Sequence, residues 1–151
     1  MPELVVTSRI GKVADGLATA IRLASAELGE FDTPPRAEWF PDFDRSDLSE
    51  GGLQCWVFPS TADPALVARG IKTAGSGLHV AVFRPMLEAP ADFIEGDQVV
   101  YRAEQLALWL LKKQIETSVC TEVKHEPVIS REFARGYRVW LSLLQTTWVE
   151  K

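Results

Sequence analysis

The sequence lacks several features that would assign it to common classes of protein. Its 151 residues include no asparagine, only two cysteines and only two histidines. Without asparagine there is no acceptor for N-glycosylation, and two cysteines are too few for a disulfide framework. The longest nearly uninterrupted apolar run, 106–111, is far shorter than the ~20 residues that a membrane span needs. We therefore expect neither a disulfide-stabilised protein nor a transmembrane one.

Positive charge is also scarce. The chain has 16 Lys+Arg against 21 Asp+Glu, a net charge of −5, and its longest basic cluster is Lys112 and Lys113. Nucleic-acid phosphates are bound by clustered basic side chains, so we expect no binding of nucleic acid through a basic face. The first residues, Met1-Pro2-Glu3-Leu4, lack the basic and apolar regions of a signal peptide. A cytosolic protein is expected.

What is present is the composition of an ordinary globular domain. Hydrophobic residues make up 46% of the chain and charged residues 25%, as is usual for soluble domains. A domain of about 150 residues buries roughly 68–70% of its unfolded surface. We therefore expect one domain, residues 1–151, with a hydrophobic core.

Two segments have helical periodicity. Apolar residues recur at helical spacing over 9–28, with Thr7 or Ser8 as the N-cap and Gly29 after the end. A second helix is predicted over 98–114, capped by Asp97. Its C-terminal half is apolar nearly all round, which predicts burial on more than one side.

The remaining apolar segments favour strands. Extended structure is predicted over 37–40, 53–58, 66–73, 77–86, 118–125 and 137–148. The last of these has apolar residues on both faces, which is typical of a central strand covered on both sides or by another subunit. The order of elements predicts an α+β fold, with two helices packed on a mainly antiparallel sheet.

Familiar binding and catalytic motifs fail when their spacing is checked. Asp42, Asp44 and Asp47 suggest a calcium loop, but the sixth and twelfth positions hold Asp47 and Leu53 instead of Gly and Glu. The glycines around Lys72 do not form a phosphate-binding loop, and no G-x-S-x-G elbow is present. We therefore predict no catalytic residue, no metal site and no cofactor.

The cysteines and histidines leave alternatives open. Cys55 and Cys120 are interpreted as buried small hydrophobic residues. The other interpretations are a metal pair with His79 or His125, a disulfide bridge and a reactive thiol. A small cytosolic enzyme or ligand-binding domain would use Cys120, His125 and Glu126.

Tryptophan is the one residue type in excess. There are five, and side chains of this kind are enriched at protein interfaces. The competing explanation is that all five tryptophans pack within the core of a single chain. The tryptophans are Trp39, Trp56, Trp109, Trp140 and Trp148.

Read in order, the segments resemble a known family. The quoted motifs are Val13-Ala14-Asp15-Gly16-Leu17-Ala18, then Ala37-Glu38-Trp39-Phe40-Pro41-Asp42-Phe43-Asp44-Arg45-Ser46-Asp47-Leu48, then Leu53-Gln54-Cys55-Trp56-Val57-Phe58-Pro59-Ser60, and Glu126-Pro127 before the closing strand. Together they resemble the small tail-terminator or tail-completion proteins of tailed bacteriophages and prophages. That family's middle strand often ends in V-Q-K-K, where this chain has Ala81-Val82-Phe83-Arg84-Pro85.

The resemblance implies a structural role in the virion and no enzymatic one. It implies a ring of copies of this chain, typically six, that caps the head-proximal end of the tail tube. The ring would stop tube polymerisation and provide a docking face for neck or connector proteins. A head–tail connector or head-completion ring protein is the alternative within the virion. The location implied is the virion, and the host cytoplasm during assembly.

A ring needs two different contact surfaces on each copy. For the contacts with neighbouring copies or partner proteins we select Trp39, Lys72, Arg131, Arg135, Trp140 and Trp148. We expect segment 126–136 to contribute to one contact and the 70–77 hairpin to reach a neighbouring ring.

Acidic residues concentrate in one segment. Residues 27–50 hold eight acids and two arginines, a local charge of −6. We expect Asp42, Asp44 and Asp47 to form an acidic surface of the channel, where like charge lets DNA pass without sequence-specific binding. No membrane partner is expected.

Overall fold

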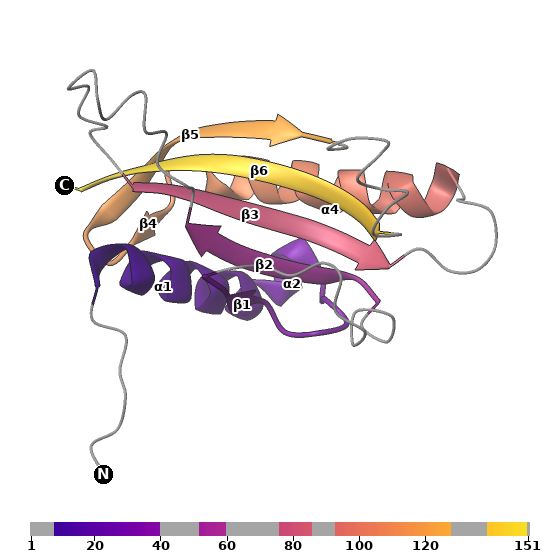
Figure 1. The fold of residues 1–151 in the computed structure, drawn as a ribbon, viewed down its shortest axis with the longest axis horizontal. Helices are drawn as coiled ribbons and strands as arrows, with labels where there is room; N and C mark the ends of the chain where they lie inside the picture. Colours follow the sequence, from indigo (N-terminus) through magenta and orange to yellow (C-terminus); the bar gives the residue numbers. More distant parts are fainter. Residues whose placement is uncertain (1–7, 40–51, 60–75, 86–92, 128–138, 151) are drawn as a thin grey trace, which may run out of the picture.

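A computed structural model of the chain describes residues 8–39, 52–59, 76–85, 93–127 and 139–150. Within these ranges the chain forms helices and one sheet (Figure 1). The helices are α1 (Arg9–Leu23), α2 (Ser25–Leu28) and α4 (Phe93–Leu110). The strands are β1 (Arg36–Ala37), β2 (Gln54–Pro59), β3 (Ser76–Pro85), β4 (Gln114–Ile115), β5 (Ser118–Glu126) and β6 (Val139–Glu150).

The sheet is mixed but mostly antiparallel. Its strand order is β1-β2-β3-β6-β5-β4; β1 pairs parallel with β2, and every other pair is antiparallel. The predicted α+β class is confirmed. The prediction of a central final strand is also confirmed, because β6 lies between β3 and β5 and has buried side chains on both faces, such as Leu144 and Leu141.

The first predicted helix forms, but in two pieces. Ser8 caps it, since its Oγ accepts a hydrogen bond from the Gly11 N–H at 3.1 Å. The helix breaks at Ala24, whose N–H is shared between the carbonyls of Ala20 and Ile21. The short α2 then ends at Gly29, whose φ of +87° suits glycine, as predicted.

The predicted bounds of the second helix are wrong at both ends. It begins at Phe93, so Asp97 lies inside α4 and is not its cap. It ends at Leu110, because Lys112 takes a φ of +69° and the Lys113 N–H bonds back to the Leu110 carbonyl at 2.9 Å. The residues after this turn form β4, which the periodicity did not predict.

The strand predictions are largely confirmed. Segments 53–58, 77–86, 118–125 and 137–148 correspond to β2, β3, β5 and β6 within two residues at each end. The predicted strand 37–40 is wrong in its extent: β1 is Arg36–Ala37, so Glu38 and Trp39 follow the strand, and Phe40 lies outside the described residues. Segment 66–73 also lies outside them. No described helix is long and apolar enough to cross a membrane.

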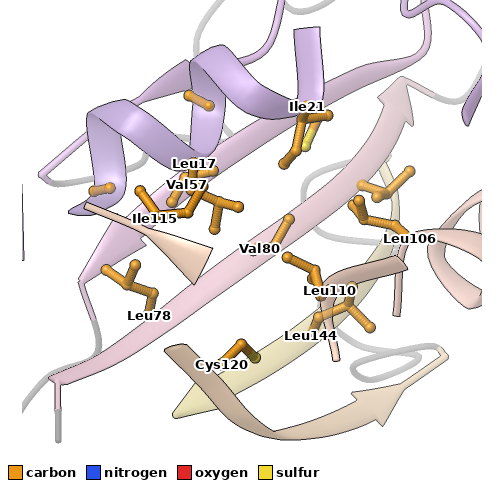
Figure 2. Close-up of a cluster of buried hydrophobic side chains, with 14 of the residues drawn as sticks. Leu17, Ile21, Val57, Leu78, Val80, Leu106, Leu110, Ile115, Cys120 and Leu144 are labelled. Carbon is orange, nitrogen blue, oxygen red and sulfur yellow. The ribbon is translucent and has the colours of Figure 1, made fainter. Parts of the chain in front are cut away.

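The main core lies between the helices and one face of the sheet (Figure 2). Helices α1 and α4 point fully buried apolar side chains at this face, and buried side chains of β2, β3 and β6 meet them. The residues in Figure 2 that show this meeting are Leu17, Ile21, Leu106, Leu110, Val57, Val80 and Leu144. We call this the helix face of the sheet.

The other face of the sheet carries a second buried cluster. It consists of Trp56, Ala81, Phe83, Val139, Leu141 and Leu143. The Trp56 and Phe83 rings meet edge to face with centroids 4.6 Å apart, a favourable aromatic geometry. Neighbouring residues on each strand therefore point to opposite faces, both of them buried near the middle of the sheet.

Candidate functional site

The outer face of α4 carries a line of exposed apolar side chains. Ile94, Tyr101 and Leu108 are 65%, 55% and 82% exposed, and their spacing of seven residues places them on one side of the helix. Leu111 continues the line beyond the helix end at 48% exposed. The prediction that this half of the helix is buried on more than one side is therefore wrong for Leu108 and Leu111.

A groove lies between α4 and β5, beside the C-terminal end of this line of side chains. Its volume is about 420 Å³, and its lining is mainly apolar. The helix side is lined by Glu104, Ala107, Leu108 and Leu111, and the strand side by Val123 and His125. We call these six residues the α4–β5 groove. Exposed apolar surface of this kind is typical of a protein–protein contact.

His125 lines this groove and also contacts a buried side chain of the sheet. Its Nε2 lies 2.6 Å from the Oγ of Ser142 on the neighbouring strand β6. Burial lowers the pKa of His125 below its usual value, and the nearby Glu104 carboxylate opposes that shift. A serine beside a histidine can be a nucleophile, but Ser142 is 0% exposed. The pair therefore ties two strands together and offers no hydroxyl to a substrate.

The enzyme alternative required Cys120, His125 and Glu126 to act together. Cys120 is fully buried, and burial raises the pKa of its thiol to about 11. Its Sγ donates to the Glu122 carbonyl at 3.7 Å, whereas His125 bonds to Ser142. The described contacts therefore do not join these three side chains into one site.

The prediction that the cysteines are buried small hydrophobic residues is confirmed. Cys55 and Cys120 are both free and buried, and burial raises the pKa of Cys55 to about 12. Among the described residues no three His, Cys, Asp or Glu side chains come together as the ligands of a metal ion would.

Among the described residues, the outer edge of β5 is paired as far as Cys120, whose backbone bonds to Lys112 and Lys113, and is open beyond it. The short strand β4 pairs only with Ser118 and Val119. A register shift between Cys120 and Glu122 marks a β-bulge, and from there to Glu126 the only paired neighbour of β5 in the described ranges is β6. An open edge presents backbone N–H and C=O groups to which another strand can bond.

The opposite edge of the sheet is formed by β1. Its Ala37 lies opposite Val57 on the helix face, and the Glu38 N–H extends the pairing to the Val57 carbonyl at 2.8 Å. Trp39, one residue further, is 56% exposed. It borders a small cavity of about 150 Å³ against the start of α1, together with Ala37 and Glu38.

Both edges carry charges on the face opposite the helices. On β1, Arg36 Nε lies 2.8 Å from Glu38 Oε1, and the Arg36 guanidinium lies 5.1 Å from the centre of the Trp56 ring. On β5, Lys124 Nζ lies 3.5 Å from Glu122 Oε1, and both side chains are mainly exposed. Each edge therefore presents charges of both signs.

The tryptophans selected as contact residues lie in different environments. Trp148 is 0% exposed, and its Nε1 donates to Thr146 Oγ1 at 2.8 Å; the fold buries it within its own chain. Trp140 is partly buried against α4, close to Gly96. Trp39 is the selected tryptophan that the structure leaves exposed.

The other selected residues lie outside the described ranges. They are Lys72, Arg131, Arg135, Asp42, Asp44 and Asp47. Most of segment 126–136 and of hairpin 70–77 lies outside them as well, apart from Glu126, Pro127, Ser76 and Gly77.

Leu108, Leu111 and Val123 were not among the residues predicted to form a contact surface. The signal available was the apolar run 106–111, which contains more apolar positions than one buried helix face can hold.

No known protein family, characterised protein or solved structure matches this chain.

Proposed function

We propose that this chain is a structural virion protein that forms a ring of six copies at the head-proximal end of a phage tail tube. The ring ends tube polymerisation and gives neck or connector proteins a docking face. It catalyses no reaction and needs no cofactor. DNA passes through it without sequence-specific binding, and the mature protein resides in the virion.

The observation that supports assembly most directly is the exposed apolar surface on α4 and β5. Leu108 is 82% exposed beside the α4–β5 groove, and the neighbouring edge of β5 is open in the described ranges. Large exposed apolar side chains next to an open strand edge favour association with another protein surface. The order of motifs that resemble tail terminators supports the phage role.

The sheet also has the two different edges that a ring requires. Its ends are formed by β1 and by β5 with β4, so a head-to-tail contact would join unlike surfaces. Such heterologous contacts close into a ring when the rotation between copies permits it.

Tube growth in the presence of the purified protein tests this function. Tail-tube protein from the same phage is polymerised with and without this chain, and tube lengths and ends are measured by electron microscopy. We expect shorter tubes with a ring at one end. Tubes of unchanged length with bare ends would contradict the proposal.

Two further outcomes identify the alternatives. Pull-down of the portal-adjacent adaptor without the tube protein would favour a connector or head-completion ring. A stable monomer whose melting temperature rises with a small ligand would favour an enzyme or ligand-binding domain.

A further inference from the structure

We propose that neighbouring copies join through their sheets: β1 of one copy adds antiparallel to the open edge of β5 in the next. In this contact Trp39 of the first copy lies in the α4–β5 groove of the second. The proposal rests on the proposed ring function and identifies the contact that would form the ring.

Strand directions allow this contact without turning one copy over. β1 runs parallel to β2, and β2, β3, β6 and β5 alternate in direction across the sheet. β1 therefore runs opposite to β5. Two copies in the same orientation, placed edge to edge, would pair these strands antiparallel, the slightly more stable arrangement. The contact is head-to-tail, as a ring requires.

The side chains fall on matching faces. Ala37 lies on the helix face of its sheet. Trp39 lies in a bend beyond the end of β1, and it borders a cavity with Gly11, Ala14 and Asp15 of α1, which places it on the helix side of the sheet. Val123 and His125 of β5 also face the helices, where they line the α4–β5 groove. If β1 of one copy were added to β5 of the next, the exposed Trp39 indole would therefore lie on the same side of the sheet as the second copy's α4–β5 groove, whose volume is about 420 Å³.

The charges on the opposite face select one register. When Ala37 is set opposite His125, Arg36 faces Glu126 and Glu38 faces Lys124, so both cross-strand pairs are of opposite charge. The same register sets Trp39 opposite Val123. Opposite charges directly across a strand pair are stabilising, and like charges are destabilising.

The neighbouring registers are unfavourable. A shift of two residues sets Arg36 opposite Lys124 and Glu38 opposite Glu122, which places like charges together. A shift of one residue sends Trp39 to the face away from the helices. The charge pairs across the two strands and the side of the sheet on which Trp39 lies therefore both favour a second copy of this chain as the occupant of the groove.

Cysteine cross-linking tests the register directly. Directly opposite residues of antiparallel strands have Cα atoms about 4.5–5.5 Å apart, which a disulfide can span. The double variant Glu38→Cys/Lys124→Cys is oxidised across a concentration series, quenched with an alkylating agent in denaturant and run on a non-reducing gel. We expect a ladder of covalent oligomers. The native Cys55 and Cys120 are buried, so the parent chain serves as the background.

Single and shifted variants provide the controls. A mixture of Glu38→Cys and Lys124→Cys single variants is expected to give mixed dimers, while each alone gives monomers. Glu38→Cys/Glu122→Cys, whose second site is on the same face of β5 two residues away, is expected to cross-link several-fold less. Dimers of Lys124→Cys alone would show β5 pairing with β5 and would overturn the proposal, as would equal cross-linking through Glu122→Cys.

A charge exchange gives a second readout that does not depend on oxidation. Lys124→Glu is expected to weaken assembly several-fold because it faces Glu38. Adding Glu38→Lys should restore part of the assembly in the double variant, because it restores the cross-strand pair although the Arg36–Glu38 and Glu122–Lys124 pairs within each strand are lost. A double variant no better than Lys124→Glu would contradict the register.

Sedimentation of the parent protein separates the contact from the function. Rings without Glu38–Lys124 cross-links would overturn this contact and leave the ring function standing. Cross-linked chains that grow as open filaments would support the contact and contradict the ring. Monomers without cross-links at every concentration would overturn both.

Discussion

The His125 Nε2 and the Ser142 Oγ lie 2.6 Å apart and join β5 to the central strand β6. Burial lowers the pKa of His125, so the unfolded chain takes up this proton at higher pH than the folded chain does. We expect the free energy of unfolding to decrease as the pH falls below about 6.5 and to be insensitive to this group above it.

This pH dependence is measured by urea unfolding between about pH 7.5 and pH 5.5, where histidine is the side chain that ordinarily titrates. His125→Gln, which does not titrate, should reduce the slope. Burial also lowers the pKa of His79, so His79→Gln should likewise reduce the slope of the unfolding free energy against pH. A chain that becomes more stable on acidification, or an unchanged slope in both variants, would contradict this interpretation.

The two thiols are expected to be unreactive in the folded protein. Burial raises the pKa of Cys55 to about 12 and that of Cys120 to about 11, and the thiolate is the reactive form. At about pH 8, where a free thiol is partly ionised, a chromogenic disulfide reagent should label neither cysteine until urea is added. Rapid labelling of one cysteine in the native protein would show that its strand opens.

The fold could largely be predicted because its signals are local. The helical period of 9–28, the cap at Ser8 and the left-handed Gly29 all appear in the structure. The end of the second helix could not be predicted, because Lys112 adopts its φ of +69° to start β4, and the pairing of β4 with β5 is a tertiary contact.

The candidate site was harder to predict, because exposure depends on which face the core leaves uncovered. Leu106, Leu108 and Leu110 are alike in sequence, yet Leu108 is exposed while the other two are buried. Trp39 and Trp148 are likewise indistinguishable by composition, but β6 carries Trp148 into the core. The packing of α4 and β6 alone decides which of these leucines and tryptophans are buried and which are exposed.

Trp148 is expected to matter for folding. Its Nε1 donates to Thr146 Oγ1, and Thr146 Oγ1 donates to the Leu78 carbonyl at 2.7 Å, so the indole N–H and this carbonyl both depend on one hydroxyl. Thr146→Val would leave the buried indole N–H without an acceptor and should destabilise the chain by about 1–3 kcal/mol.

The double variant Thr146→Val/Trp148→Phe checks the origin of this loss. Because it removes the donor together with its acceptor, its loss should be less than the sum of the two single losses. Additive losses in chemical denaturation would show that the hydrogen bond contributes nothing. Trp39→Phe, at an exposed position, is the matched aromatic control and should leave stability within about 0.5 kcal/mol.

Leu106 and Leu108 give the sharpest separation between folding and assembly. They are two residues apart on α4, but Leu106 is 1% exposed and Leu108 is 82% exposed. Leu106→Ala should cost about 2–5 kcal/mol because it opens a cavity in the core. Leu108→Ala should change the stability of the monomer by no more than about 0.5 kcal/mol.

Assembly should show the opposite order. Leu108→Glu places a charge on the apolar surface of the α4–β5 groove, and a charge buried there without a partner is costly. We expect it to leave the melting temperature of the monomer nearly unchanged while abolishing oligomers in sedimentation and capping of tail tubes. Oligomers that persist in Leu108→Glu would show that association uses another surface, whereas a large loss of monomer stability would show that Leu108 packs within its own chain.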